Sequence, residues 1–160
     1  MIIQGGATVE EKQGETTGTE LTSGETRHGK TILLVDDDGT SLERLKAILE
    51  RRGYRVVAEQ DPRNALALMR DGTRPIDLVI TDYRMPNMDG LEFSRALKRA
   101  APGTPLILIT AHSDIESYLK AVNIGVLEYI NKPVVANELL RIVGVTLDRR
   151  IDGGMSGGVV

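Results

Sequence analysis

Short apolar segments alternate with longer amphipathic segments through most of this chain, and this alternation restricts its fold more than any other feature. The apolar segments have the length of buried strands, and in the segments that follow, apolar residues repeat at helical spacing. Five such strand–helix units predict an α/β fold, a doubly wound parallel sheet with helices on both faces. The predicted strands are Thr31–Val35, Arg55–Ala58, Leu78–Thr81, Leu106–Thr110 and Val126–Ile130.

Several predicted helices carry recognisable end signals. Asp61-Pro62 is typical of an N-cap followed by proline at the first helical position. Ser113 and Glu116 have the spacing of a capping box. Gly53 and Gly125 are predicted to follow the ends of the first and fourth helices, because glycine readily adopts the left-handed conformation found there. The remaining helices are predicted over Leu91–Ala100 and about 135–149.

Composition distinguishes the middle of the chain from its two ends. Residues 1–29 are mostly Gly, Thr, Glu and Ser, which offer little apolar surface to offset the entropy of ordering a backbone, so a disordered tail is predicted. Residues 151–160 are glycine-rich and are predicted to form a flexible tail. The prediction is therefore one folded domain over residues 30–150.

Charge and cysteine content exclude some classes of function. The formal net charge of -3 gives no reason to predict binding to nucleic acid or to a membrane. The chain has no cysteine, which excludes disulfides and thiolate chemistry. Its apolar runs are far shorter than the ~20 residues of a membrane-spanning helix, and its start lacks the pattern of a signal peptide. A cytoplasmic protein is predicted.

Aspartates stand at the ends of two predicted strands. Asp36 and Asp37 follow the first strand, and Asp82 follows the third, just before a turn built on 86–90. The carboxyl ends of parallel strands are the edge at which open α/β sheets bind ligands. Clustered carboxylates raise one another's pKa values unless a cation lies among them, and hard oxygen ligands suit Mg²⁺. Asp38, by contrast, is interpreted as a helix N-cap.

Four motifs together resemble the receiver domain of two-component response regulators, over about residues 30 to 148. They are Val35-Asp36-Asp37-Asp38, the segment from Val79 to Gly90, Ile109-Thr110-Ala111 and Asn131-Lys132-Pro133. The resemblance implies a five-stranded sheet in the order 2-1-3-4-5, the flavodoxin-like or CheY-like arrangement. In that order the first and third strands are neighbours, so their aspartates would converge in one crevice.

The resemblance also implies roles for the acidic residues. Asp82 would be the phosphoacceptor. Asp37 would bind Mg²⁺ directly, Asp36 would bind it through water, and Asp82 and the backbone carbonyl of Arg84 would complete the ligands. The chain would then receive a phosphoryl group from a phosphohistidine, on a sensor histidine kinase or a histidine phosphotransfer protein. It would be a signalling switch rather than a metabolic enzyme.

Further roles follow from the same resemblance. Lys132 would bring its ammonium to the phosphoryl group, ahead of a cis bond to Pro133, and Val134 replaces the phenylalanine common after that proline. Thr110 would donate to a phosphoryl oxygen, and Ala111 would leave room for that group.

The switch would use Thr110 and Tyr129, because phosphorylation would draw Thr110 inward and let Tyr129 turn in behind it. Arg84 and His112 occupy positions that vary in the family, and we expect both to shield the aspartyl phosphate from water. With no output domain in this sequence, a stand-alone regulator is predicted. Its signal would leave through the fourth helix, fifth strand and fifth helix, toward a target protein or a second copy of the chain.

Two alternatives remain at this point. The run 33–40 also fits the hhhDxDGT signature of haloacid-dehalogenase-like phosphatases, with Asp36 as nucleophile and Asp38 as acid/base. Against it, no acidic metal motif follows Lys132, no cap insertion is visible, and Asp82 with its turn would be unexplained. The second alternative is a pseudoreceiver that only binds partners. Such domains usually lack an acidic, acceptor or lysine position, and here all are filled.

Overall fold

A computed structural model describes residues 29–112 and 114–153 of the chain, with only the backbone of residues 150–153. Five strands alternate with five helices along these residues. The strands are β1 (Thr31–Val35), β2 (Arg55–Glu59), β3 (Leu78–Asp82), β4 (Leu106–Thr110) and β5 (Glu128–Asn131). The helices are α1 (Gly39–Arg51), α2 (Pro62–Asp71), α3 (Gly90–Ala100), α4 (Ile115–Ile124) and α5 (Ala136–Gly153).

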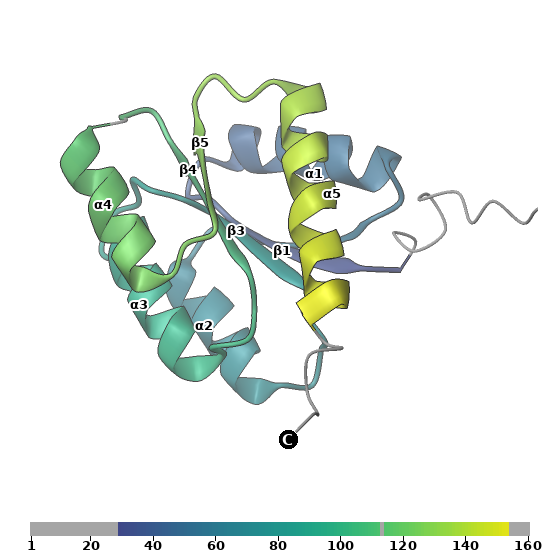
Figure 1. The fold of residues 1–160 in the computed structure, drawn as a ribbon, viewed down its shortest axis with the longest axis horizontal. Coiled ribbons are helices and arrows are strands. Elements are labelled where there is room, and N and C mark those ends of the chain that lie inside the picture. Colours follow the sequence, from purple (N-terminus) through teal and green to yellow (C-terminus); the bar gives the residue numbers. More distant parts are fainter. Residues whose placement is uncertain (1–28, 113, 154–160) are drawn as a thin grey trace, which may run out of the picture.

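The strands form one parallel sheet in the order β2-β1-β3-β4-β5, as the resemblance implied. The register places Val35 beside Thr81 on the two neighbouring strands β1 and β3. The residues that follow these strands therefore lie side by side at one edge of the sheet. Figure 1 shows the sheet between α1 and α5 on one side and α2, α3 and α4 on the other.

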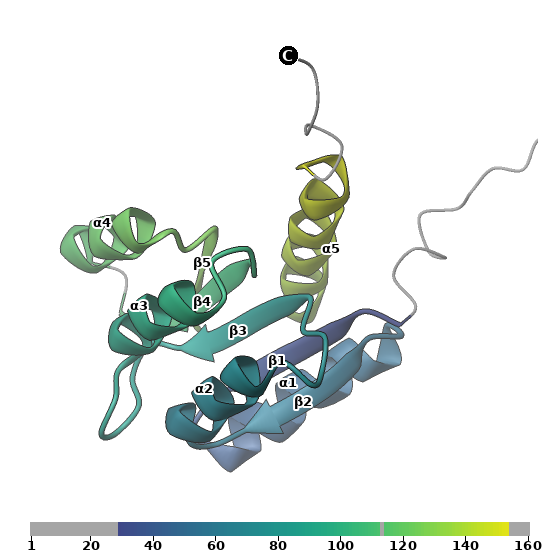
Figure 2. The same cartoon turned by 90° about the horizontal axis from the view of Figure 1, so that it is seen from below.

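Two apolar cores lie on the two faces of the sheet. One joins the inward side chains of α1 and α5 to the sheet, and the other does so for α2, α3 and α4. Every residue of β3 and β4 is buried, because helices cover both faces of these central strands, whereas β2 at the edge is only partly buried. Figure 2 shows the helices on opposite sides of the twisted sheet.

Most of the predicted helix ends are confirmed. The Asp61 side chain accepts a hydrogen bond from the backbone N–H of Arg63, with Pro62 as the first residue of α2. Asp38 caps α1 in the same way, through the backbone N–H of Thr40. Gly53 and Gly125 have φ angles of 98° and 97°, the left-handed conformation predicted for them.

The main differences from the predicted boundaries are in α4, β5 and α5. The N-cap of α4 is Asp114 instead of Ser113, which lies outside the described residues; the Asp114 carboxylate accepts the N–H of Ser117. Strand β5 begins at Glu128 because the N–H of Val126 still bonds to Ala121 in closing α4. Helix α5 continues to Gly153, past its predicted end at residue 149.

Most of the two predicted tails, residues 1–28 and 154–160, lies outside the described residues. Among the helices that the structure describes, none is both long and apolar enough to cross a membrane.

Candidate functional site

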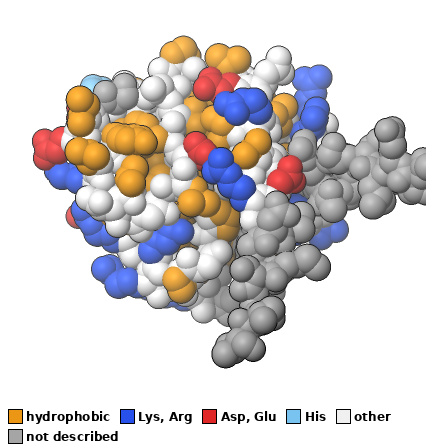
Figure 3. All heavy atoms as spheres, viewed as in Figure 1, with side chains coloured by type: hydrophobic (Ala, Val, Ile, Leu, Met, Phe, Trp, Pro, Cys, Tyr) orange, Lys and Arg blue, Asp and Glu red, His pale blue; other side chains and the backbone are white. Residues whose placement is uncertain are grey.

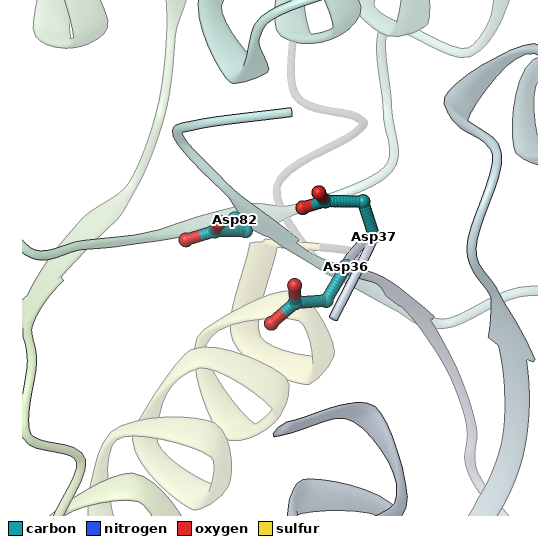
Figure 4. Close-up of side chains that lie close together, drawn as sticks. All are labelled: Asp36, Asp37 and Asp82. Atoms are coloured by element: carbon teal, nitrogen blue, oxygen red, sulfur yellow. The ribbon is translucent and has the colours of Figure 1, made fainter. Parts of the chain in front are cut away.

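Three aspartates meet at the carboxyl edge of the sheet. Asp36 and Asp37 follow β1, and Asp82 is the last residue of β3. Each contributes a carboxylate oxygen to a group whose members all lie within 4.8 Å of one another (Figure 4). Asp36 and Asp82 are buried, with exposed fractions of 3% and 7%, whereas Asp37 is exposed. The strand order thus brings together the three residues that the sequence indicated.

The backbone after β1 fixes the first carboxylate. Asp36 accepts a hydrogen bond from the N–H of Asp38 at 2.9 Å, and its own N–H donates to the carbonyl of Glu59 on β2. The Asp38 side chain caps α1 and is not a member of the acidic group. Asp38 therefore has the N-cap role predicted for it.

A lysine that directly follows the last strand, β5, reaches the same site. The Nζ atom of Lys132 lies 3.0 Å from a carboxylate oxygen of Asp82. The Lys132 backbone N–H donates to the carbonyl of Thr110 at 2.7 Å, which anchors the residue beside β4. The bond between Lys132 and Pro133 is cis, and Val134 packs into the core between the sheet, α1 and α5. Lys132 is thus placed as a cation beside Asp82.

Burial dominates the ionisation of Asp82. Removal from water raises the pKa of this carboxyl above its ordinary value of 3.8, and repulsion from Asp36 raises it further. The hydrogen bond and charge of Lys132 act in the opposite direction but do not cancel the effect of burial. A cation that could bind between the carboxylates would relieve the same repulsion.

The turn after β3 passes very close to Asp82. The N–H of Gly90 donates to the carbonyl of Tyr83 at 2.7 Å, which closes the turn. A Cβ atom on Gly90 would lie only 2.4 Å from the backbone oxygen of Asp82, so only glycine fits without a backbone shift. Arg84 lies on this turn with an exposed side chain.

Hydroxyl groups hold the loop after β4. The Thr110 hydroxyl donates to the carbonyl of His112 and accepts the N–H of the same residue, both at 3.0 Å. The half-buried Tyr129 donates its hydroxyl to that carbonyl as well, at 3.0 Å. Ala111 and His112 are exposed. Thr110, His112 and Tyr129 therefore form one connected group.

The two residues predicted to shield the aspartyl phosphate, Arg84 and His112, make no side-chain hydrogen bond or ion pair with any other residue that the structure describes. Both side chains are exposed, on the loops that follow β3 and β4. Neither residue belongs to the acidic group, and their shielding role stays a prediction.

The donor set fits a divalent cation with oxygen ligands. Three carboxylates within 4.8 Å carry more negative charge than the one neighbouring ammonium offsets. Carboxylate and carbonyl oxygens, with one carboxylate open to solvent, suit Mg²⁺, which keeps several of its waters.

One feature near the site was not predicted from the sequence. The hydroxyl of Tyr83, the residue after Asp82, lies 3.2 Å from the hydroxyl of Ser117 on α4. No periodicity or motif relates residues 34 positions apart in this way. Only the packing of α4 against the α3 side of the sheet brings them together.

Known proteins share both the sequence pattern and the fold. A family model described as the response regulator receiver domain matches residues 32–144. The two-component response regulator ARR10 of Arabidopsis thaliana is 39% identical over 114 residues, covering 71% of this chain and 20% of that protein. The transcriptional regulatory protein ZraR of Escherichia coli O157:H7 is 38% identical over 103 residues, covering 64% and 23%. The chain thus spans only about a fifth of the length of these relatives.

Solved structures agree. A CheY-like response regulator receiver domain protein from Methanospirillum hungatei JF-1 is 31% identical, with a TM-score of 0.74, covering 78% of this chain and 98% of that one. The signal receiver domain of an HD domain-containing protein from Pseudomonas fluorescens Pf-5 is 32% identical, with a TM-score of 0.72, covering 78% and 99%. Because the family model matches residues 32–144, more than half of the chain, the chain belongs to the response regulator receiver domains of two-component systems.

Proposed function

We propose that this chain accepts a phosphoryl group on Asp82 from a phosphohistidine, carried by a sensor histidine kinase or a histidine phosphotransfer protein. The observation that carries the proposal is the acidic group within 4.8 Å with Lys132 at 3.0 Å from Asp82. A nucleophilic carboxylate, a cation beside it and further anionic ligands are the parts that phosphoryl transfer to aspartate requires.

The transfer itself exchanges one bond for another. A carboxylate oxygen of Asp82 attacks phosphorus while the bond between phosphorus and the histidine nitrogen breaks, and the electron pair of that bond stays on the imidazole. Lys132, already paired with Asp82, balances negative charge on the phosphoryl oxygens. Ala111 leaves space beside the group.

Mg²⁺ would be held by Asp36, Asp37, Asp82 and the backbone carbonyl of Arg84. When bound, it would supply positive charge that lowers the repulsion between the carboxylate nucleophile and the phosphoryl oxygens. Asp36 is pre-oriented for this role by the N–H of Asp38, and the exposed Asp37 faces solvent.

The switch would begin with Thr110. Its hydroxyl donates to the carbonyl of His112 here, so a bond to a phosphoryl oxygen requires that contact to break. Tyr129, which donates to the same carbonyl, would lose a neighbour and turn inward. A new charge thereby shifts the balance between two arrangements of one hydrogen-bonded group.

Arg84 and His112 would lengthen the lifetime of the aspartyl phosphate by covering it. Both side chains are exposed on the loops that follow β3 and β4, and neither makes a side-chain hydrogen bond or ion pair with another described residue. The Arg84→Ala/His112→Ala double variant should lose its phosphoryl group faster than wild type. Intact-mass analysis over time measures how fast the phosphorylated form of each protein decays. Equal decay rates would contradict the shielding role.

The signal would leave through the face formed by α4, β5 and α5. Large hydrophobic side chains are unusually exposed there, and Figure 3 shows hydrophobic groups gathered over α4. A hollow of about 210 Å³ between α4 and β5 adds shape to this surface. We propose that it binds a downstream target protein or a second copy of the chain. The exposed residues are Ile115, Tyr118, Leu119, Val122, Leu127 and Val135.

The proposal extends to the organisation of the chain. Residues 30–150 would form one receiver domain that works in the cytoplasm as a signalling switch and not as a metabolic enzyme. It would bind neither nucleic acid nor a membrane itself.

Incubation with acetyl phosphate, followed by intact-mass analysis, tests the proposed function. Wild type should gain one phosphoryl group only with Mg²⁺ present, and Asp82→Asn should gain none. Glu43→Gln, a matched loss of one exposed carboxylate on α1, should behave as wild type. Steady phosphate release that depends on Asp36, with no adduct, would favour the phosphatase. Neither adduct nor release would indicate a pseudoreceiver.

A further inference from the structure

Tyr83 connects the phosphoacceptor strand to α4. Its backbone is fixed beside Asp82, because its N–H donates to the carbonyl of Ile109 at 2.8 Å and its carbonyl accepts the N–H of Gly90 at 2.7 Å. Its half-buried side chain packs against the core of the α2–α4 face. The position of the ring is therefore set by the same backbone that carries the proposed site.

The Tyr83 hydroxyl is the first of a series of hydrogen bonds that runs through Ser117 to Asp114. The hydroxyl of Ser117 lies 3.2 Å from it and 2.9 Å from a carboxylate oxygen of Asp114. The two hydrogen bonds from Ser117, backbone and side chain, keep the pKa of Asp114 below its ordinary value, so the group is a carboxylate that can only accept. Ser117 therefore gives its one proton to Asp114, and the Tyr83 hydroxyl donates to Ser117.

This series of hydrogen bonds ends at the N-cap of α4, a helix with few buried residues. Asp114 caps α4, and Ser117 is one of only two buried residues among those of α4, the other being Ala121. Ile115, in the first turn, is 80% exposed. Because few apolar contacts hold this turn, its hydrogen bonds supply a large part of its local stability.

We propose that Tyr83 positions the first turn of α4 through Ser117 and Asp114. It thereby couples the phosphoacceptor strand to α4 by a route separate from Thr110 and Tyr129. The inference rests on the proposed phosphorylation of Asp82. Movement of the backbone around Asp82 would shift the Tyr83 hydroxyl and loosen or tighten the cap at Asp114.

Amide hydrogen exchange of the full chain tests this coupling. The peptide over 115–124 is followed with Mg²⁺ alone and with Mg²⁺ and beryllofluoride, a phosphoryl analogue. In Tyr83→Phe the first turn should exchange about fivefold faster without the analogue, the change expected for loss of one net hydrogen bond. The change that the analogue produces in this peptide should also be smaller than in wild type, which a merely structural role would not predict.

Two variants serve as controls. Thr73→Val removes a hydroxyl that bonds to Asp71 in the exposed segment after α2, and should leave both quantities unchanged. In a Ser117→Ala background, Tyr83→Phe should add little, because the Ser117 hydroxyl through which Tyr83 reaches Asp114 is already absent.

If Tyr83→Phe shows the same change in exchange on adding beryllofluoride as wild type, this inference is overturned and the proposed function is not. A wild-type chain with no response to the analogue, and no phosphoryl adduct by intact mass, would overturn the proposed function and the inference together.

Discussion

Asp82 is a carboxyl group that the fold makes costly to ionise. It is 7% exposed, and burial followed by repulsion from Asp36 outweighs the attraction of Lys132, so its pKa is raised. A carboxylate at this position has lost most of the water that would otherwise stabilise its charge, so ionisation costs free energy. At this residue the fold therefore keeps a carboxyl group next to the Lys132 ammonium at a cost in stability.

The raised pKa of Asp82 predicts a pH dependence of stability. The folded state holds this proton more tightly than the unfolded state, whose value is near 3.8, so the free energy of unfolding falls as pH rises from 3.8 through the raised value. Without Mg²⁺, Asp82→Asn should therefore be more stable than wild type at pH 7, and the difference should shrink toward pH 4.

Urea denaturation of both proteins across this pH range measures the effect. Glu43→Gln, which removes an exposed carboxylate, should show a much smaller change at pH 7. Equal stabilities of wild type and Asp82→Asn at every pH would contradict the account of this residue.

At the scale of elements, the turn between β3 and α3 sets the environment of Asp82. Gly90 begins α3, its N–H closes the turn on Tyr83, and Asp89 caps the helix in a capping box with Glu92. The sequence pattern indicated a turn here but not that Gly90 lies against the backbone of Asp82, because that contact depends on how β3 and α3 pack.

Gly90→Ala should destabilise the protein by about 1–3 kcal/mol, since the new Cβ meets backbone atoms that must move. Gly103→Ala is the matched control, because a Cβ there meets nothing within 4 Å, and its effect should stay within about 0.5 kcal/mol. Urea denaturation compares the two. Equal effects would show that the close approach at Gly90 is not a constraint.

The sequence predicted elements better than contacts between them. The strands, most caps and the convergence of Asp36, Asp37 and Asp82 follow from local patterns together with the implied strand order. The start of α4 did not, because Ser113 and Asp114 are neighbours in the sequence and both are suitable N-caps. The contact of Tyr83 was missed because its partner belongs to a helix that is distant in the sequence.

At the scale of the molecule, strand order creates the site. Because β1 and β3 are neighbours, carboxylates that are far apart in the sequence lie within 4.8 Å in the folded chain alone. The unfolded chain has no such group. Ligands that bind this group should consequently stabilise the whole fold.

Mg²⁺ should therefore raise the unfolding temperature of wild type. At a concentration one hundred times the dissociation constant, the expected stabilisation is about 2.7 kcal/mol. Asp37→Asn should lose most of this response, whereas Glu43→Gln should keep it. Thermal unfolding at several Mg²⁺ concentrations measures the shift, and an equal response in Asp37→Asn would contradict the predicted ligand set.

The location of the phosphoryl group tests the central claim most directly. Wild type is treated with acetyl phosphate and Mg²⁺, then with borohydride, which reduces an aspartyl phosphate to homoserine, and its peptides are sequenced by mass spectrometry. The account predicts homoserine at position 82 and at no other aspartate. Homoserine at position 36, or none at all in a folded protein, would contradict it.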